Sequence, residues 1–289
     1  KAAKPGEPSW DSPWGAGRPG WHIECSAMSQ KYLGETFDIH CGGVDNLFPH
    51  HENEIAQSES ATGKPFVRYW LHSEHLIVDG DKMSKSLGNF YTLPQLLEMG
   101  KDPRAIRYLF LSVHYRQKLN FTFDSLDAAA AALKRVDEMR FRLDHATEEG
   151  APRPAVAEAA GALTERFGDA LADDLNLSGA LAEVFVFVRF VNRAIEGGEL
   201  GEGDRQRISG PLDQVDRVLG VLDASAWKSE SAETSGPSDA EIDAMVRART
   251  EARANRDFAT ADRLRDELAV LNIVIEDTPS GPRWRRKDD

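Results

Sequence analysis

The sequence predicts an α/β domain, then an all-α helical bundle, then a small α+β module. Three observations carry this prediction. Over residues 1–101, short strand-like runs alternate with Gly-rich turns and helical patterns, as in a parallel nucleotide-binding sheet. Over 102–225, apolar residues recur at helical spacing. A polar, low-complexity stretch at 226–238 predicts a linker, and 239–289 then has its own helix-helix-hairpin pattern.

The N-terminal elements follow from local patterns. Residues 5–20, rich in Pro and Gly, predict an irregular loop, with Trp10 and Trp14 expected to pin it to the core. A helix should follow and end at Gly34. Further expected elements are a strand at 36–40, a Gly-rich turn at 41–45, a helix opened by Pro49, and short strands at 67–70 and 75–78.

The later elements are mainly helical. Asp124 is a plausible N-cap for a helix over 125–149, which Gly150 and Pro152 should break. The remaining expected elements are helices over 155–171, around 181–191, and over 204–222, 239–256 and 258–271, followed by a hairpin that joins 273–275 to 283–285.

Composition narrows the class of protein. The 289 residues are 41% hydrophobic, which suffices for two or three domains with real cores. No apolar stretch reaches the roughly 18 residues of a membrane helix, so no membrane partner is expected. Cys25 and Cys41 are the only cysteines, which favours a reducing, cytoplasmic location. The net charge of −13 argues against indiscriminate nucleic-acid binding but permits a specific RNA partner.

Three residues form a candidate metal site. In a helix, His50 and Glu54 lie one turn apart on the same face. With the thiolate of Cys25 they supply the nitrogen, oxygen and sulfur ligands that zinc accepts. Cys25 is too far upstream for a zinc finger, but separate segments often converge on one ion. The alternative is that Cys25 is simply a small buried apolar residue.

A polar loop follows the turn at Asp79-Gly80, and it reads Lys82-Met83-Ser84-Lys85-Ser86. This is the signature loop of class I aminoacyl-tRNA synthetases. Together with the upstream stretches RPGWHIECSAM (18–28) and FPHHENE (48–54), it resembles cysteinyl-tRNA synthetase. The resemblance extends over essentially the whole chain. It implies a partial Rossmann-like class I synthetase core, a helical bundle and an anticodon-binding module.

The resemblance implies an ATP-dependent ligase. L-cysteine and ATP, with magnesium, would give cysteinyl-adenylate, and the cysteinyl group would then pass to tRNA(Cys). Zinc would select the substrate thiol over the hydroxyl of serine. A monomer is expected. The implied site residues are Lys82 and Lys85 for catalysis; Lys85, Gly42, Gly43 and Asp45 for ATP; Trp21 and Asp45 for cysteine; Arg253, Asp262, Asp277 and Trp284 for tRNA; and Cys25, His50 and Glu54 for zinc.

Two family features have no counterpart in these residues, namely an N-terminal Cys that is the fourth zinc ligand and a His-x-Gly-His signature. We therefore expect the chain to be the C-terminal portion of the enzyme and to be inactive alone, and zinc retention stays open. Two alternatives remain. A mycothiol-pathway cysteine ligase shares the motifs but lacks a module like 239–289. A non-catalytic tRNA-binding fragment is the other.

Overall fold

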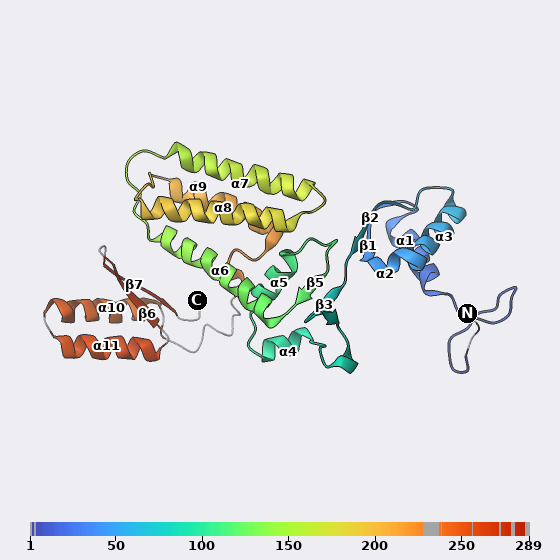
Figure 1. The fold of residues 1–289 in the computed structure, drawn as a ribbon, viewed down its shortest axis with the longest axis horizontal. Coiled ribbons are helices and arrows are strands. Elements are labelled where there is room, and N and C mark those ends of the chain that lie inside the picture. Colours follow the sequence, from blue (N-terminus) through green and yellow to red (C-terminus); the bar gives the residue numbers. More distant parts are fainter. Residues whose placement is uncertain are drawn as a thin grey trace. The chain divides into compact units, whose positions relative to one another are not determined.

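The computed structural model describes residues 2, 4–227, 237, 239–255, 257–271, 273–278 and 281–286. The chain divides into two compact units, Lys1–Leu222 and Asp223–Asp289. The predicted fold class is confirmed: an α/β part and a helical bundle lie in the first unit, and helices with a hairpin form the second (Figure 1). None of the described helices is both long and apolar enough to cross a membrane.

The first segment differs from its prediction. Trp10 and Trp14 do not pin it, because their side chains are 60% and 92% exposed. The loop is closed instead by its own backbone. The Trp10 N–H donates to the Gly17 carbonyl at 2.8 Å, and the Gly17 N–H returns the bond at 2.9 Å. Such a bridge fixes the backbone without burying either ring.

Two parallel strands flanked by helices carry the candidate metal site. β1 pairs with β2 in parallel, with Gly42 opposite His72. The strand therefore runs through Cys41, Gly42 and Gly43, where a turn was predicted, because the β2 ladder continues alongside them. The elements in chain order are α1 (Trp21–Leu33), β1 (Phe37–Gly43), α2 (Val44–Asn46), a π-type turn (Leu47–His51), α3 (Glu52–Thr62) and β2 (Val67–Ser73).

The lysine loop is attached to a three-stranded sheet of order β4-β3-β5. Asp79 and Gly80 have φ values of 51° and 84° and form the predicted tight turn between β3 and β4. β5 pairs with β3 in parallel although it lies beyond residue 101. The elements are β3 (Leu76–Val78), β4 (Asp81–Lys82), a 3-10 helix (Lys85–Leu87), α4 (Leu93–Glu98) and β5 (Leu119–Phe121).

The helices of the first unit share one apolar core with this sheet, and that core extends from Val78 to Leu222. The N-cap of α6 is Thr122 rather than Asp124. The hydroxyl of Thr122 accepts from the Ser125 N–H at 3.0 Å, and the Ser125 hydroxyl accepts from the Thr122 N–H at 3.1 Å. The helices are α5 (Pro103–Leu111), α6 (Phe123–Asp144), α7 (Pro154–Ala172), α8 (Leu177–Glu196) and α9 (Asp204–Leu219).

The second unit has a small core made of Ile242, Val246, Leu268 and Ile273. The predicted hairpin is confirmed, since β6 and β7 pair antiparallel. Most of the expected linker, residues 228–236 and 238, lies outside the described residues. The elements are a 3-10 helix (Ser225–Trp227), α10 (Asp239–Ala254), α11 (Phe258–Val270), β6 (Ile273–Thr278) and β7 (Gly281–Arg286).

Candidate metal centre and adenylation residues

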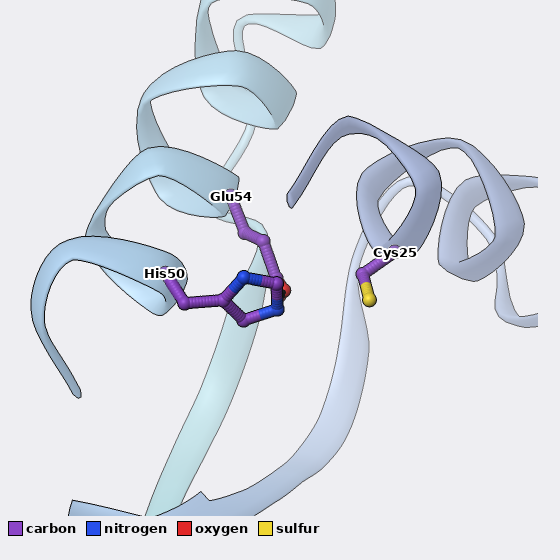
Figure 2. Close-up of side chains that lie close together, drawn as sticks. All are labelled: Cys25, His50 and Glu54. Carbon is purple, nitrogen blue, oxygen red and sulfur yellow. Dashed lines mark ion pairs between the residues drawn. The ribbon is translucent and has the colours of Figure 1, made fainter. Parts of the chain in front are cut away.

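Two segments far apart in the sequence bring Cys25, His50 and Glu54 together. Cys25 comes from α1, His50 from the π-type turn, and Glu54 from the first turn of α3 (Figure 2). Their ligand atoms all lie within 4.8 Å of one another. His50 Nε2 is 2.6 Å from Glu54 Oε1, which is the i,i+4 contact that helical spacing predicts.

The site is buried, and it is polar. Glu54 is 0% exposed and His50 is 6% exposed, whereas Cys25 is partly exposed. Burial raises the pKa of the Cys25 thiol, and the negative charge of Glu54 raises it further. A thiolate at this position therefore needs a cation beside it, and metal binding would release the thiol proton.

The donor set fits a zinc ion. Sulfur, nitrogen and carboxylate oxygen are all zinc ligands. Within the part of the chain that the structure describes, Glu54 Oε1 and His50 Nδ1 are buried atoms without a hydrogen-bond partner. The short contact of Glu54 Oε1 with His50 Nε2 thus lacks hydrogen-bond geometry. A buried carboxylate oxygen beside a thiol and an imidazole is an arrangement that a divalent cation would satisfy.

Three further histidines surround this centre, and sequence reasoning missed them. His40 Nε2 lies 2.7 Å from Glu54 Oε2, and His51 Nδ1 lies 2.8 Å from His72 Nε2. The ligand atoms of His40, His51 and Glu54 also lie within 4.8 Å of one another. The parallel register of β1 and β2, which the sequence does not give, places His40 opposite Trp70 and His72 opposite Gly42 and so brings both histidines to this centre.

Two of these histidines resist protonation. Burial lowers the pKa of His51 to about 4, with a further contribution from neighbouring His40. Burial and His40 also lower the pKa of His72. Both rings are therefore neutral near pH 7, so one of them can donate to the other in the His51–His72 hydrogen bond.

The predicted substrate-binding residues border the centre. The Trp21 ring lies 3.9 Å from the His50 ring, between centroids, and its side chain is 59% exposed. Close packing also accounts for glycine at position 42, because a Cβ there would come within 2.7 Å of His51 Cε1. A Cβ on Gly43 would likewise clash with Asp45 Oδ1. Asp45 is exposed just beyond the carboxyl end of β1, where ligands bind in parallel sheets.

Lys82 and Lys85 are both exposed, on a loop that Asn89 closes. The Asn89 side chain accepts from the Ser84 N–H at 2.8 Å and donates to the Lys82 carbonyl at 3.1 Å. Lys85 Nζ lies 5.3 Å from the centroid of the Phe90 ring. Asn89 is a loop-shaping residue to which the sequence analysis gave no role.

The predicted tRNA-contacting residues lie in the second unit. Trp284 packs partly against the small core, and its Nε1 donates to Asp243 Oδ1 at 2.7 Å. Arg253 is in α10, and Asp262, in α11, pairs with Arg265 at 3.3 Å. Asp277 belongs to β6, and its side chain lies outside the described part of the chain.

Family models match three parts of the chain. The family model of the class I (C) tRNA synthetase catalytic domain matches residues 1–131. The DALR domain matches 166–223, and the anticodon-binding domain of cysteinyl-tRNA ligase matches 237–285.

Named relatives agree with these matches. The cysteine--tRNA ligases of Solibacter usitatus and Geobacter sulfurreducens are 50% and 46% identical over 99% of the chain. The chain covers 60% and 62% of their lengths. A LeuRS structure from Agrobacterium radiobacter K84, a ternary complex with tRNA and LeuAMS, shares the fold. The superposition covers 74% of this chain and 32% of the LeuRS chain, with a TM-score of 0.53 and 18% sequence identity. Domain models of the cysteinyl-tRNA synthetase family thus match three parts of the chain, and the chain is similar to named members of that family over 99% of its length.

Proposed function

We propose that the chain is part of an enzyme that activates L-cysteine with ATP and transfers the cysteinyl group to tRNA(Cys). The observation that supports this most directly is the convergence of Cys25, His50 and Glu54 on one buried point, in a chain that also carries the lysine loop. When bound, zinc would supply a preference for the thiolate of cysteine over the neutral hydroxyl of serine.

Different residues of the chain would bind the zinc ion, the substrate cysteine and the adenosine. Cys25, His50 and Glu54 would hold the ion, and the exposed Trp21 ring beside His50 would wall the space around the substrate side chain. The Asp45 carboxylate is exposed and can accept from the substrate ammonium group or a ribose hydroxyl. Gly42 and Gly43 would let the adenosine approach the backbone.

ATP would bind together with magnesium. Adenylate formation then places new negative charge on the departing pyrophosphate. Lys85 would meet this charge in the transition state, with Lys82 assisting, and one well-placed donor of this kind contributes about 2–4 kcal/mol. Gly80 and Gly88, with φ values of 84° and 71°, flank the loop and support its movement toward ATP.

The second unit would read the tRNA anticodon. Arg253, Asp262 and Asp277 offer donors and acceptors for exposed base edges, and Trp284 offers a ring for stacking. We propose that the enzyme is cytoplasmic, because Cys25 and Cys41 are both free thiols, as a reducing compartment keeps them, and that it acts as a monomer. The same unit disfavours the mycothiol-pathway ligase, whose substrate has no anticodon.

A cysteine-dependent pyrophosphate-exchange assay tests this function. The chain should be compared with the same chain joined to the segment of a relative that the match does not cover. We expect exchange with cysteine and not with serine in the joined protein, and its loss in Cys25→Ser. A joined protein that binds tRNA(Cys) but never exchanges pyrophosphate would identify a non-catalytic tRNA-binding protein. Activity with an amino-sugar inositol as acceptor would favour the mycothiol-pathway ligase.

A further inference from the structure

We propose that His40 is a positioning residue that holds the Glu54 carboxylate in the orientation in which it binds zinc. The proposal deepens the proposed function and rests on it, since it takes Cys25, His50 and Glu54 as the zinc ligands. It concerns how well the ligands are ordered before the ion arrives.

The two oxygens of Glu54 have different surroundings. Oε2 lies 2.7 Å from His40 Nε2, whereas Oε1 lies 2.6 Å from His50 Nε2 and has no hydrogen-bond partner of good geometry among the described residues. An ionised carboxylate only accepts, so His40 donates through its Nε2–H. One oxygen is thereby held by His40, and the other is left to the ligand cluster that includes Cys25.

The ring of His40 is itself held in place. His40 lies on β1 opposite Trp70 of β2, and the two rings stack with their centroids 4.8 Å apart and their planes at 25°. The His51 ring lies 4.5 Å away, and His51 is hydrogen-bonded to His72. The His40 side chain is 19% exposed, and the Glu54 side chain beside it is 0% exposed. The donor is therefore on a strand and packed by aromatic rings, which limits its rotation.

A held carboxylate binds a metal better than a free one. Glu has three side-chain torsions, and ordering them on binding costs conformational entropy. A hydrogen bond from an outer partner spares part of that cost and keeps one oxygen directed at the ion. Loss of such a partner typically weakens metal affinity 10- to 100-fold. If His40 served only to fill space, zinc affinity would not depend on its Nε2–H.

Two polar substitutions separate these roles. In Gln the amide nitrogen takes nearly the place of histidine Nε2 and can donate to Glu54, whereas the shorter Asn does not reach. Zinc dissociation constants of the joined protein, which also carries the segment of the relative, should be measured by competition with a chromophoric chelator, for wild type, His40→Gln, His40→Asn and Cys25→Ser. We expect His40→Asn to bind zinc about 10- to 100-fold more weakly and His40→Gln to bind close to wild type.

The matched control is His72→Asn, in the same cluster. His72 contacts His51 and has no hydrogen bond to Glu54 among the described contacts, so its loss should change zinc affinity much less. Thermal unfolding in excess chelator identifies a variant that merely fails to fold. Should His40→Asn fail, His40→Phe, which removes the donor and keeps a ring against Trp70, is measured in its place.

The outcomes are distinguishable. Equal affinities for His40→Asn and His40→Gln would overturn the positioning role. Loss of a second, separately titrating zinc in His40→Asn would overturn it as well, by making His40 a ligand. If wild type binds no zinc, or if Cys25→Ser binds it as tightly as wild type, it is the proposed zinc centre that fails.

Discussion

Gly42 stands where the backbone of β1 passes directly against the His51 ring. A Cβ there would come within 2.7 Å of His51 Cε1 and 3.1 Å of Nε2. We predict that Gly42→Ala displaces this ring and destabilises the chain by about 1–3 kcal/mol, the usual cost of overpacking. Urea unfolding in chelator measures it. Gly161→Ala in α7 is the control, because a Cβ added there would meet nothing within 4 Å.

The contradictory result for Gly42 is specific. If Gly42→Ala is as stable as wild type, then the His51–His72 pair has room to move, and the glycine serves ligand approach alone. A change confined to ATP use in the joined protein would point the same way.

Lys85 is the residue from which we expect the largest kinetic effect. In the joined protein, Lys85→Ala should lower the turnover of pyrophosphate exchange roughly 100-fold and leave the KM for cysteine nearly unchanged, because charge develops only in the transition state. Lys64→Ala is the control, since Lys64 pairs with Glu35 on the surface. A rise in KM alone, with full turnover, would remove Lys85 from the chemistry.

Sequence reasoning reached some residues of the centre and missed others for one reason. His50 and Glu54 were found because four-residue spacing is a local signal that a helix turns into a contact. His40 and His72 lie on different strands, so only the parallel register brings them to the same centre. A single sequence holds no record of register, and their roles therefore needed the structure.

At the scale of elements, Asp204 joins the starts of two helices. Its Oδ2 accepts from the Arg153 N–H before α7 and from the Gly201 N–H, both at 2.9 Å, and the residue is 0% exposed. Burial alone would raise the pKa of this carboxyl, but these bonds and Arg207 outweigh it and lower the pKa. The ionised form thus stabilises the fold at pH values above the unfolded pKa.

We predict that Asp204→Asn lowers the free energy of unfolding at pH 7 by about 1–3 kcal/mol, because the amide NH2 must then face either the backbone N–H groups or the Arg207 guanidinium, and all of these are donors. The difference from wild type should narrow as the pH falls below 3.8 through the lower native pKa, where the native carboxyl also becomes protonated. Urea unfolding at a series of pH values measures this. Asp213→Asn, an exposed carboxylate on the same helix, is the control. A pH-independent difference would show that charge is not what Asp204 contributes.

Elements were predictable where caps and periodicity agreed, and their ends were not where two signals competed. The helix near residue 125 was expected from its apolar pattern, yet both Thr122 and Asp124 are good N-cap residues. The reciprocal bonds of Thr122 with Ser125 decided between them. β1 is longer than predicted, because its glycines indicate a turn in the sequence but pair with a neighbouring strand in the structure.

At the scale of the whole molecule, the proposed chemistry and the proposed anticodon reading belong to different compact units. Replacing Trp284 with Ala in the joined protein should lower aminoacylation efficiency about five- to a hundredfold, the cost of one lost base stack, and leave pyrophosphate exchange intact. Trp284→Ala alone does not isolate base stacking, because Trp284 also donates a hydrogen bond to Asp243 and packs on the small core.

Trp284→Phe separates the two contributions, since it keeps a stacking ring and loses the hydrogen bond to Asp243. We expect Phe to retain most of the tRNA use that Ala loses. Equal losses in both variants would mean that the indole matters for the unit's own structure and not for base stacking. The sequence predicts Trp284 as a base-stacking ring, but its bond to Asp243 and its packing on the small core needed the structure.

The complete burial of Glu54 has a consequence for motion. Its described neighbours are imidazoles and a thiol, with no lysine or arginine paired to it. Removing a bound cation would leave a negative charge inside the protein, and the first turn of α3 would open more often to hydrate it. Backbone amides of Glu52–Thr62 should therefore exchange with deuterium faster in chelator than in zinc. The rate of local opening of this one helix would therefore depend on the zinc concentration around the protein.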